Sequence, residues 1–137
     1  VPHIFTCLLG YVFFVRAAFC AVKSLACKDR QNETEAYRLV GCGLVFYTVG
    51  MLLGSCWARQ AWGQWWSWDP KEAFSLGVWF VLAASLVFRA YYKQRFLTLN
   101  CLWVIIGFVL IVWGVTVVNF SRLFSGLHSY AANWMQK

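Results

Sequence analysis

Long apolar runs, separated by shorter polar or aromatic segments, make up most of the chain. A helix needs about 20 apolar residues to cross the ~30 Å hydrocarbon core of a bilayer. Four runs come close to or exceed that length, and they lie at residues 4–26, 38–57, 73–91 and 99–120. The pattern predicts an all-α fold, a polytopic membrane helical bundle with about four transmembrane helices.

The connectors between these runs differ in character. Residues 27–37 are polar, residues 58–72 are dominated by tryptophan, and residues 92–98 are short and basic. With four spans, the N-terminus, the tryptophan-rich connector and the C-terminus share one side of the membrane. The first and third connectors lie on the other side.

Composition agrees with a membrane protein. Hydrophobic residues make up 61% of the chain and charged residues 12%, which is too apolar for a soluble domain of this size. The lipid bilayer is therefore the expected surroundings. The chain begins at Val1, and no signal-peptide pattern precedes the first span. We expect a fragment or subdomain of a longer protein, with a partner segment or subunit missing.

The basic residues predict the orientation. A net charge of +7 would suggest nucleic acid in a soluble protein, but here the charges lie mainly in connectors, so we expect no nucleic-acid partner. The first and third connectors with their flanks hold seven basic residues: Lys23, Lys28, Arg30, Arg38, Arg89, Lys93 and Arg95. The opposite side holds four: Arg59, Lys71, Arg122 and Lys137. By the positive-inside rule, the tryptophan-rich connector faces outward.

Features within the spans indicate helix contacts. Arg16 lies about midway along the first span, where a cation is costly and faces the protein interior, water or a partner. Internal pairing and contact with another subunit both remain open for it. Gly50 and Gly54 form a GxxxG, and Gly107 and Gly114 lie one heptad apart. Such small residues allow close helix approach in lipid.

The tryptophan-rich connector is a candidate binding surface. The chain has nine tryptophans. Five of them lie close together, within residues 57–68: Trp57, Trp62, Trp65, Trp66 and Trp68. An interfacial aromatic belt explains one or two tryptophans at a span end. The denser cluster predicts a flat apolar surface suited to a large planar ligand. Just after it, Asp69, Pro70 and Glu72 are predicted to cap the third span.

Both histidines of the chain fall on the predicted outer side. His3 lies at the start of the first span, and His128 lies just beyond the end of the fourth. Each could be an ordinary interfacial polar residue, but together they flank the aromatic connector. Neutral imidazole is an axial ligand for haem iron. Arg59 and Arg122, with Lys71, are candidate partners for the haem propionates.

The residues from Trp62 to Glu72 read WGQWWSWDPKE. This segment resembles the tryptophan-rich WWD signature of the haem-handling proteins of cytochrome c biogenesis, and its WDPKE ending is most similar to the CcsA/ResC branch. The segment from Gly126 to Tyr130, GLHSY, also resembles the end of CcsA-type chains. The resemblance extends from His3 to Tyr130, and it identifies residues 1–137 as the C-terminal membrane domain of a CcsA/ResC-like protein.

The resemblance implies a site and a role. His3 and His128 match the two outer histidines that are axial ligands of haem iron in the family. The matching haem surface is the WWD loop, with Trp62, Trp65, Trp66, Trp68 and Asp69. The family presents haem b to the CxxCH of apocytochrome c for thioether attachment, as a component of a cytochrome c haem lyase or synthase system with a CcsB/ResB-like membrane partner. The expected location is the bacterial inner membrane or a thylakoid membrane.

Two other functions remain as alternatives. The first is a b-type haem protein that transfers electrons, but such proteins hold haem between histidines inside their spans, and no span here carries an internal histidine. The second is a structural or channel subunit without haem, in which the tryptophans only anchor the chain at the interface.

Overall fold

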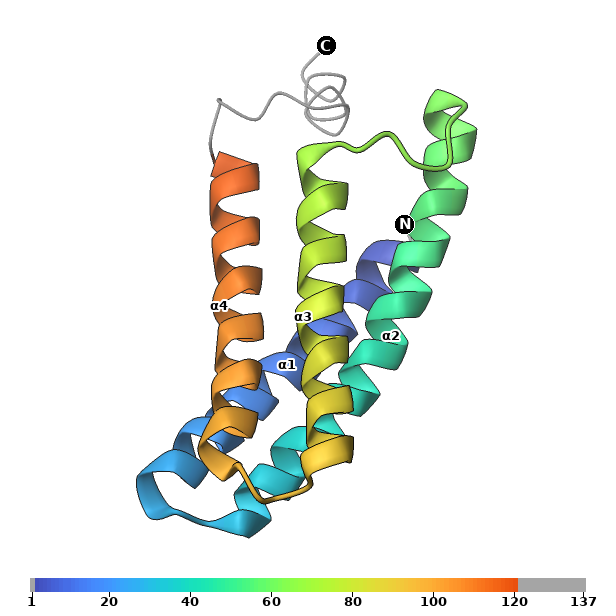
Figure 1. Ribbon diagram of the computed structural model, residues 1–137. Coiled ribbons are helices and arrows are strands. Elements are labelled where there is room, and N and C mark those ends of the chain that lie inside the picture. Colours follow the sequence, from blue (N-terminus) through green and yellow to red (C-terminus); the bar gives the residue numbers. More distant parts are fainter. Residues whose placement is uncertain (1, 121–137) are drawn as a thin grey trace.

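The computed structural model describes residues 2–120, and this part of the chain is helical with no strand. Its four helices are α1 (Pro2–Cys27), α2 (Arg30–Trp62), α3 (Pro70–Tyr92) and α4 (Leu97–Phe120). Each is long and apolar enough to cross a membrane. The predicted all-α membrane bundle is thus confirmed (Figure 1).

Neighbouring helices in the sequence run in opposite directions (Figure 1). The N-terminal end of α1 and the α2–α3 loop lie at one end of the bundle, called here the tryptophan end. The two short connections, α1–α2 and α3–α4, lie at the opposite end. Helix α1 packs mainly on α2 and also contacts α4, while α3 contacts α4 and α2.

Helix α2 is longer than the apolar run that predicted it. Only Lys28 and Asp29 separate it from α1, so most of the polar segment 27–37 is helical rather than a connector. The Asp29 side chain caps α2 by accepting the Gln31 backbone N–H at 2.8 Å. At its other end α2 continues to Trp62. Hydropathy marks the stretch that lipid can surround, whereas the capping groups set where a helix ends.

Close backbone approach holds α1 on α2 and α3 on α4. A Cβ atom built on Gly43 of α2 would lie 2.6 Å from the Phe14 ring of α1. One built on Gly107 of α4 would lie 3.0 Å from Leu82 Cγ of α3. Because these positions have no side chain, the facing side chains fill the space. The approach at Gly107 is one that the spacing of small residues predicts, whereas Gly43 lies outside the predicted pairs.

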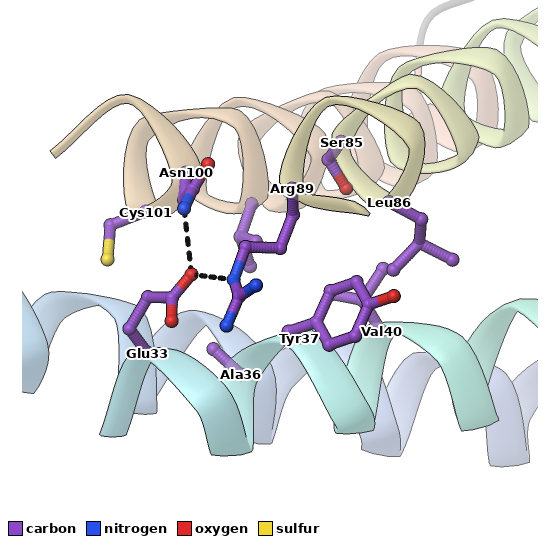
Figure 2. A pocket seen from close by; sticks show the side chains of 10 residues that line it. Glu33, Ala36, Tyr37, Val40, Ser85, Leu86, Arg89, Asn100 and Cys101 are labelled. Atoms are coloured by element: carbon purple, nitrogen blue, oxygen red, sulfur yellow. Dashed lines mark hydrogen bonds and ion pairs between the residues drawn. The ribbon is translucent and has the colours of Figure 1, made fainter. Parts of the chain in front are cut away.

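A buried polar cluster joins three helices at the end opposite the tryptophans (Figure 2). Glu33 of α2 is 2% exposed. Its Oε1 accepts Arg89 Nε of α3 and, at 2.8 Å, Asn100 Nδ2 of α4. Its Oε2 accepts Gln94 Nε2 of the α3–α4 connection at 3.1 Å. One carboxylate therefore fixes the relative positions of α2, α3 and α4.

We predict that Glu33→Gln destabilises the bundle by about 3–5 kcal/mol, because Arg89 then keeps a largely buried charge without a counterion. Thermal unfolding of the purified protein in detergent measures the loss. Glu35→Gln is the matched control, since Glu35 is exposed, and it should change stability little. Equal stability of the two variants would contradict the role given to Glu33.

Candidate functional site

His3 lies in the first turn of α1, against the tryptophan end of α2. Its ring stacks on Trp57 with 5.5 Å between the ring centroids and 28° between the planes. A Cβ atom built on Gly54 would lie 3.7 Å from His3 Cδ2. The imidazole is therefore positioned by packing between a glycine and an indole of the neighbouring helix.

The GxxxG of α2 explains why His3 fits there. Cys7 follows His3 by one helical turn, and Gly50 precedes Gly54 by one turn. A Cβ atom on Gly50 would overlap Cys7 Sγ. Gly54 and Gly50 thus leave room for His3 and Cys7, which lie on successive turns of α1. Sequence reasoning assigned this motif only to general compactness, although the four-residue spacing shared by His3 and Cys7 indicates which face of α1 it receives.

An open pocket of about 290 Å³ lies beside the histidine. It is lined by both α1 and α2 and by the loop and first turn of α3. His3, Trp57, Trp66, Lys71 and Glu72 are among the residues that line it. The structure therefore brings His3 to the same pocket as Trp66 and Lys71, two residues of the WWD segment that lie more than 60 positions further along the chain.

The tryptophans differ in their exposure. Two edge-to-face pairs connect them, Trp57 with Trp62 at 4.9 Å between centroids and Trp66 with Trp68 at 6.1 Å. Trp57, Trp62 and Trp66 are partly buried, whereas Trp65 is 56% and Trp68 is 71% exposed. The cluster consequently has an inner part beside His3 and an outer part open to the surroundings.

The backbone of the α2–α3 loop is fixed at both ends and in the middle. Gly63 ends α2 with φ 77°, a left-handed conformation that glycine adopts without steric cost. Arg59 donates to the Gly63 carbonyl oxygen, so this predicted propionate partner lies at the C-terminal cap of α2. In mid-loop, Ser55 Oγ donates to the Trp65 carbonyl oxygen at 2.8 Å. Trp68 also has positive φ, at 56°.

The acidic residues after the tryptophans organise the loop. Asp69 and Glu72 form the predicted capping box, with Pro70 in the first turn of α3. The Asp69 carboxylate accepts the Lys71 N–H at 2.9 Å, and Asp69 is not among the residues that line the pocket. Glu72 does more than complete the cap. Its Oε2 also accepts Ser67 N–H at 2.8 Å and Ser67 Oγ at 3.1 Å.

His128 and Arg122 lie outside the described residues. The second axial ligand and one of the propionate partners therefore stay predictions. His3 and Lys71 are the predicted ligand and cation that the structure brings to the pocket with Trp66. Trp57 also lines the pocket. It lies more than one helical turn before Trp62, so the resemblance of the WWD segment does not include it.

We predict that Glu72→Ala loosens the tryptophan loop. The Ser67 amide loses a charged acceptor worth about 1.5–3 kcal/mol, so its hydrogen exchange should accelerate by about tenfold or more. Ser67→Ala is the matched control, because it removes only the hydroxyl contact and keeps the backbone N–H on Glu72. Mass spectrometry of the loop peptides measures both variants, and equal acceleration in the two would refute the anchoring role.

The fold and pocket define a class of protein, a multi-pass helical membrane protein with an aromatic pocket at one end of its bundle. Residues 1–128 match the family described as "Cytochrome C assembly protein". The chain belongs to this family.

Proteins called "Cytochrome c biogenesis protein CcsA" are similar to the chain. The protein from Gloeobacter violaceus is 45% identical over 98 residues, which cover 69% of this chain and 27% of that protein. The protein from Cuscuta exaltata is 42% identical over 103 residues, covering 71% of this chain and 30% of that protein. That from Prochlorococcus marinus (strain NATL2A) is 39% identical over 103 residues, covering 73% and 31%. The chain thus spans less than a third of the length of these relatives. No solved structure matches it.

Proposed function

We propose that this chain serves cytochrome c assembly by holding haem at its tryptophan end for attachment to apocytochrome c. The observation that carries the proposal is the position of the His3 imidazole in an aromatic pocket beside the WWD loop. Membership of the cytochrome c assembly family supports the process. In this proposal haem b is the substrate, and the chain binds and orients it.

The donor set of the pocket suits haem. An imidazole can bind iron axially, and His3 is stacked on Trp57, which limits its ring orientation. Trp57 and Trp66 offer apolar aromatic surface to the macrocycle. Lys71 lines the same pocket and offers a cation to a propionate. Arg59 and Arg122 are the further cations of the proposal, and His128 is the second axial ligand.

The attachment chemistry needs orientation more than acid–base catalysis from this chain. Each thioether forms when a cysteine thiol of the CxxCH adds across a haem vinyl group. A carbon–sulfur bond forms, and the thiol proton ends on the other vinyl carbon, so no electrons are gained or lost overall. The nucleophile belongs to apocytochrome c. The role of the loop residues is to keep the vinyl groups in a fixed place while that protein approaches.

The proposed partners follow from this role. They are apocytochrome c, a CcsB/ResB-like membrane protein and the lipid bilayer. The proposed location is the bacterial inner membrane or the thylakoid membrane, with the tryptophan end outward. The bacterial and plant sources of the similar proteins are compatible with either membrane.

We predict that topology reporters will report this orientation. A reporter fused after Gln64, in the α2–α3 loop, should be exported, because most basic residues lie at the opposite end. One fused after Gln94, between α3 and α4, should remain on the inner side. Paired alkaline phosphatase and green fluorescent protein fusions measure the two sides, and the reverse pattern would separate the tryptophan end from any outer haem site.

We predict that His3→Gly and His128→Gly each remove one iron–nitrogen bond from haem in the full-length protein. The visible spectrum should shift away from that of bis-histidine haem. Free imidazole should partly restore it, because a small ligand can enter the vacated position while the tryptophans still hold the macrocycle. The double variant should retain only a small fraction of the haem.

Two outcomes would count against the proposal in different ways. A spectrum that survives His3→Gly but collapses with His128→Gly means that the second ligand comes from elsewhere. A full-length protein that purifies without a Soret band favours the structural or channel alternative. An electron-transfer cytochrome is disfavoured because His3 stacks on Trp57, near the loop end of α2, rather than facing the middle of that helix.

A further inference from the structure

Arg16 is exposed near the middle of α1. At a rise of 1.5 Å per residue it lies about 17 Å from the Cys27 end of the helix, which is about half of the ~30 Å hydrocarbon core. Among the described residues, none forms an ion pair or hydrogen bond with it. The internal pairing that the sequence left open for Arg16 is therefore not formed within this part of the chain.

Arg16 borders a regular apolar stripe on α1. The stripe consists of six side chains that are each more than half exposed: Phe5, Leu8, Val12, Val15, Phe19 and Val22. They alternate in steps of three and four, which is the spacing that keeps one face of a helix against a neighbouring helix. The opposite face of α1 carries Gly10, Phe14 and Ala17, is buried, and packs within the bundle. The stripe with Arg16 is called here the arginine face.

Lipid alone would accept the apolar side chains of this face but not the guanidinium. A charged side chain at the bilayer centre is costly, and intramembrane arginines pair with other groups or line water. Headgroup phosphates lie at the surfaces, about 15 Å from the centre of the hydrocarbon core. A group that pairs with the guanidinium at this depth would therefore have to be carried there by protein.

A second copy of this chain does not supply that group. The five acidic residues of the chain are Asp29, Glu33, Glu35, Asp69 and Glu72. All lie at the ends of helices, within the first two turns or at the caps. Glu33 and Glu72 are in addition buried and engaged with their own donors. The complementary carboxylate belongs to a different helix.

We propose that the arginine face of α1 packs against a transmembrane helix of the same polypeptide, outside residues 1–137, which carries an Asp or Glu opposite Arg16. Charge complementarity at this depth calls for the carboxylate, and the heptad spacing of the stripe calls for a helix. The source is the same polypeptide because the chain spans less than a third of the length of its similar proteins. The proposal is independent of haem binding.

The test uses the full-length protein and measures the amount of monodisperse folded protein extracted from membranes. Arg16→Glu should lower it by about tenfold or more, because two carboxylates then face each other in lipid. Arg16→Lys should keep most of it, since the charge remains. Phe19→Leu, on the same face but uncharged, is the matched control and should keep nearly all of it.

Charge reversal identifies the partner helix. In the Arg16→Glu background, each intramembrane Asp or Glu of the full-length protein is replaced in turn by Arg, and one replacement should restore the folded amount to within about twofold. The proposal is overturned if Arg16→Leu gives as much folded protein as the parent or more, because the arginine then faces lipid or water without a partner. It is equally overturned if only a reversal on a separate subunit restores folding.

Discussion

The carboxylate of Glu33 is the contact on which the arrangement of three helices depends. Helices in lipid gain little from burying apolar surface against each other, because the lipid tails are equally apolar. Close packing and polar contacts must then specify which helices pair. Glu33 accepts hydrogen bonds from Arg89 of α3 and Asn100 of α4 (Figure 2). It also accepts one from Gln94 of the α3–α4 connection. These contacts join α3 and α4 to α2 at this end of the bundle, from which α3 leads back to the α2–α3 loop at the other end.

A second buried carboxylate, that of Glu72, organises the tryptophan end in a similar way. Glu72 accepts the backbone and hydroxyl of Ser67 and lies within hydrogen-bond distance of the Asp69 N–H. An ionised carboxylate accepts several hydrogen bonds at once, so one side chain can order a loop that has no regular structure. Glu33 holds helices together at one end of the bundle, and Glu72 holds the tryptophan-bearing loop at the other end. The position of Trp66 beside His3 depends on both, together with the contact of His3 with Gly54.

The sequence predicted the helices from hydropathy alone, and the capping box before α3 from three residues, because both signals are local. It did not predict that α2 would start at Arg30, since the polar first turns are stabilised by the Asp29 cap and by Glu33 contacts with distant residues. The meeting of His3 with Trp57 and Gly54 also escaped the sequence. That contact depends on the register of α1 on α2, which Gly43 and Gly50 set through side chains 29 to 43 residues away, Phe14 and Cys7. The exposure of Arg16 likewise required the packed bundle to be seen.

The length of α2 has a consequence for how molecules reach the tryptophan end. Its 33 residues make a helix of about 50 Å, longer than the ~40–45 Å of a bilayer with its headgroups. The excess length is divided between its two ends, because the apolar run within it covers residues 38–57. The loop from Gly63 to Asp69 begins about 9 Å beyond that run. Trp65 and Trp68 are exposed on this loop, where the proposed function has apocytochrome c approach from water, whereas Trp57 is partly buried at the end of the apolar run. One small aromatic cluster therefore has an exposed outer side and a partly buried inner side, and the two sides have different surroundings.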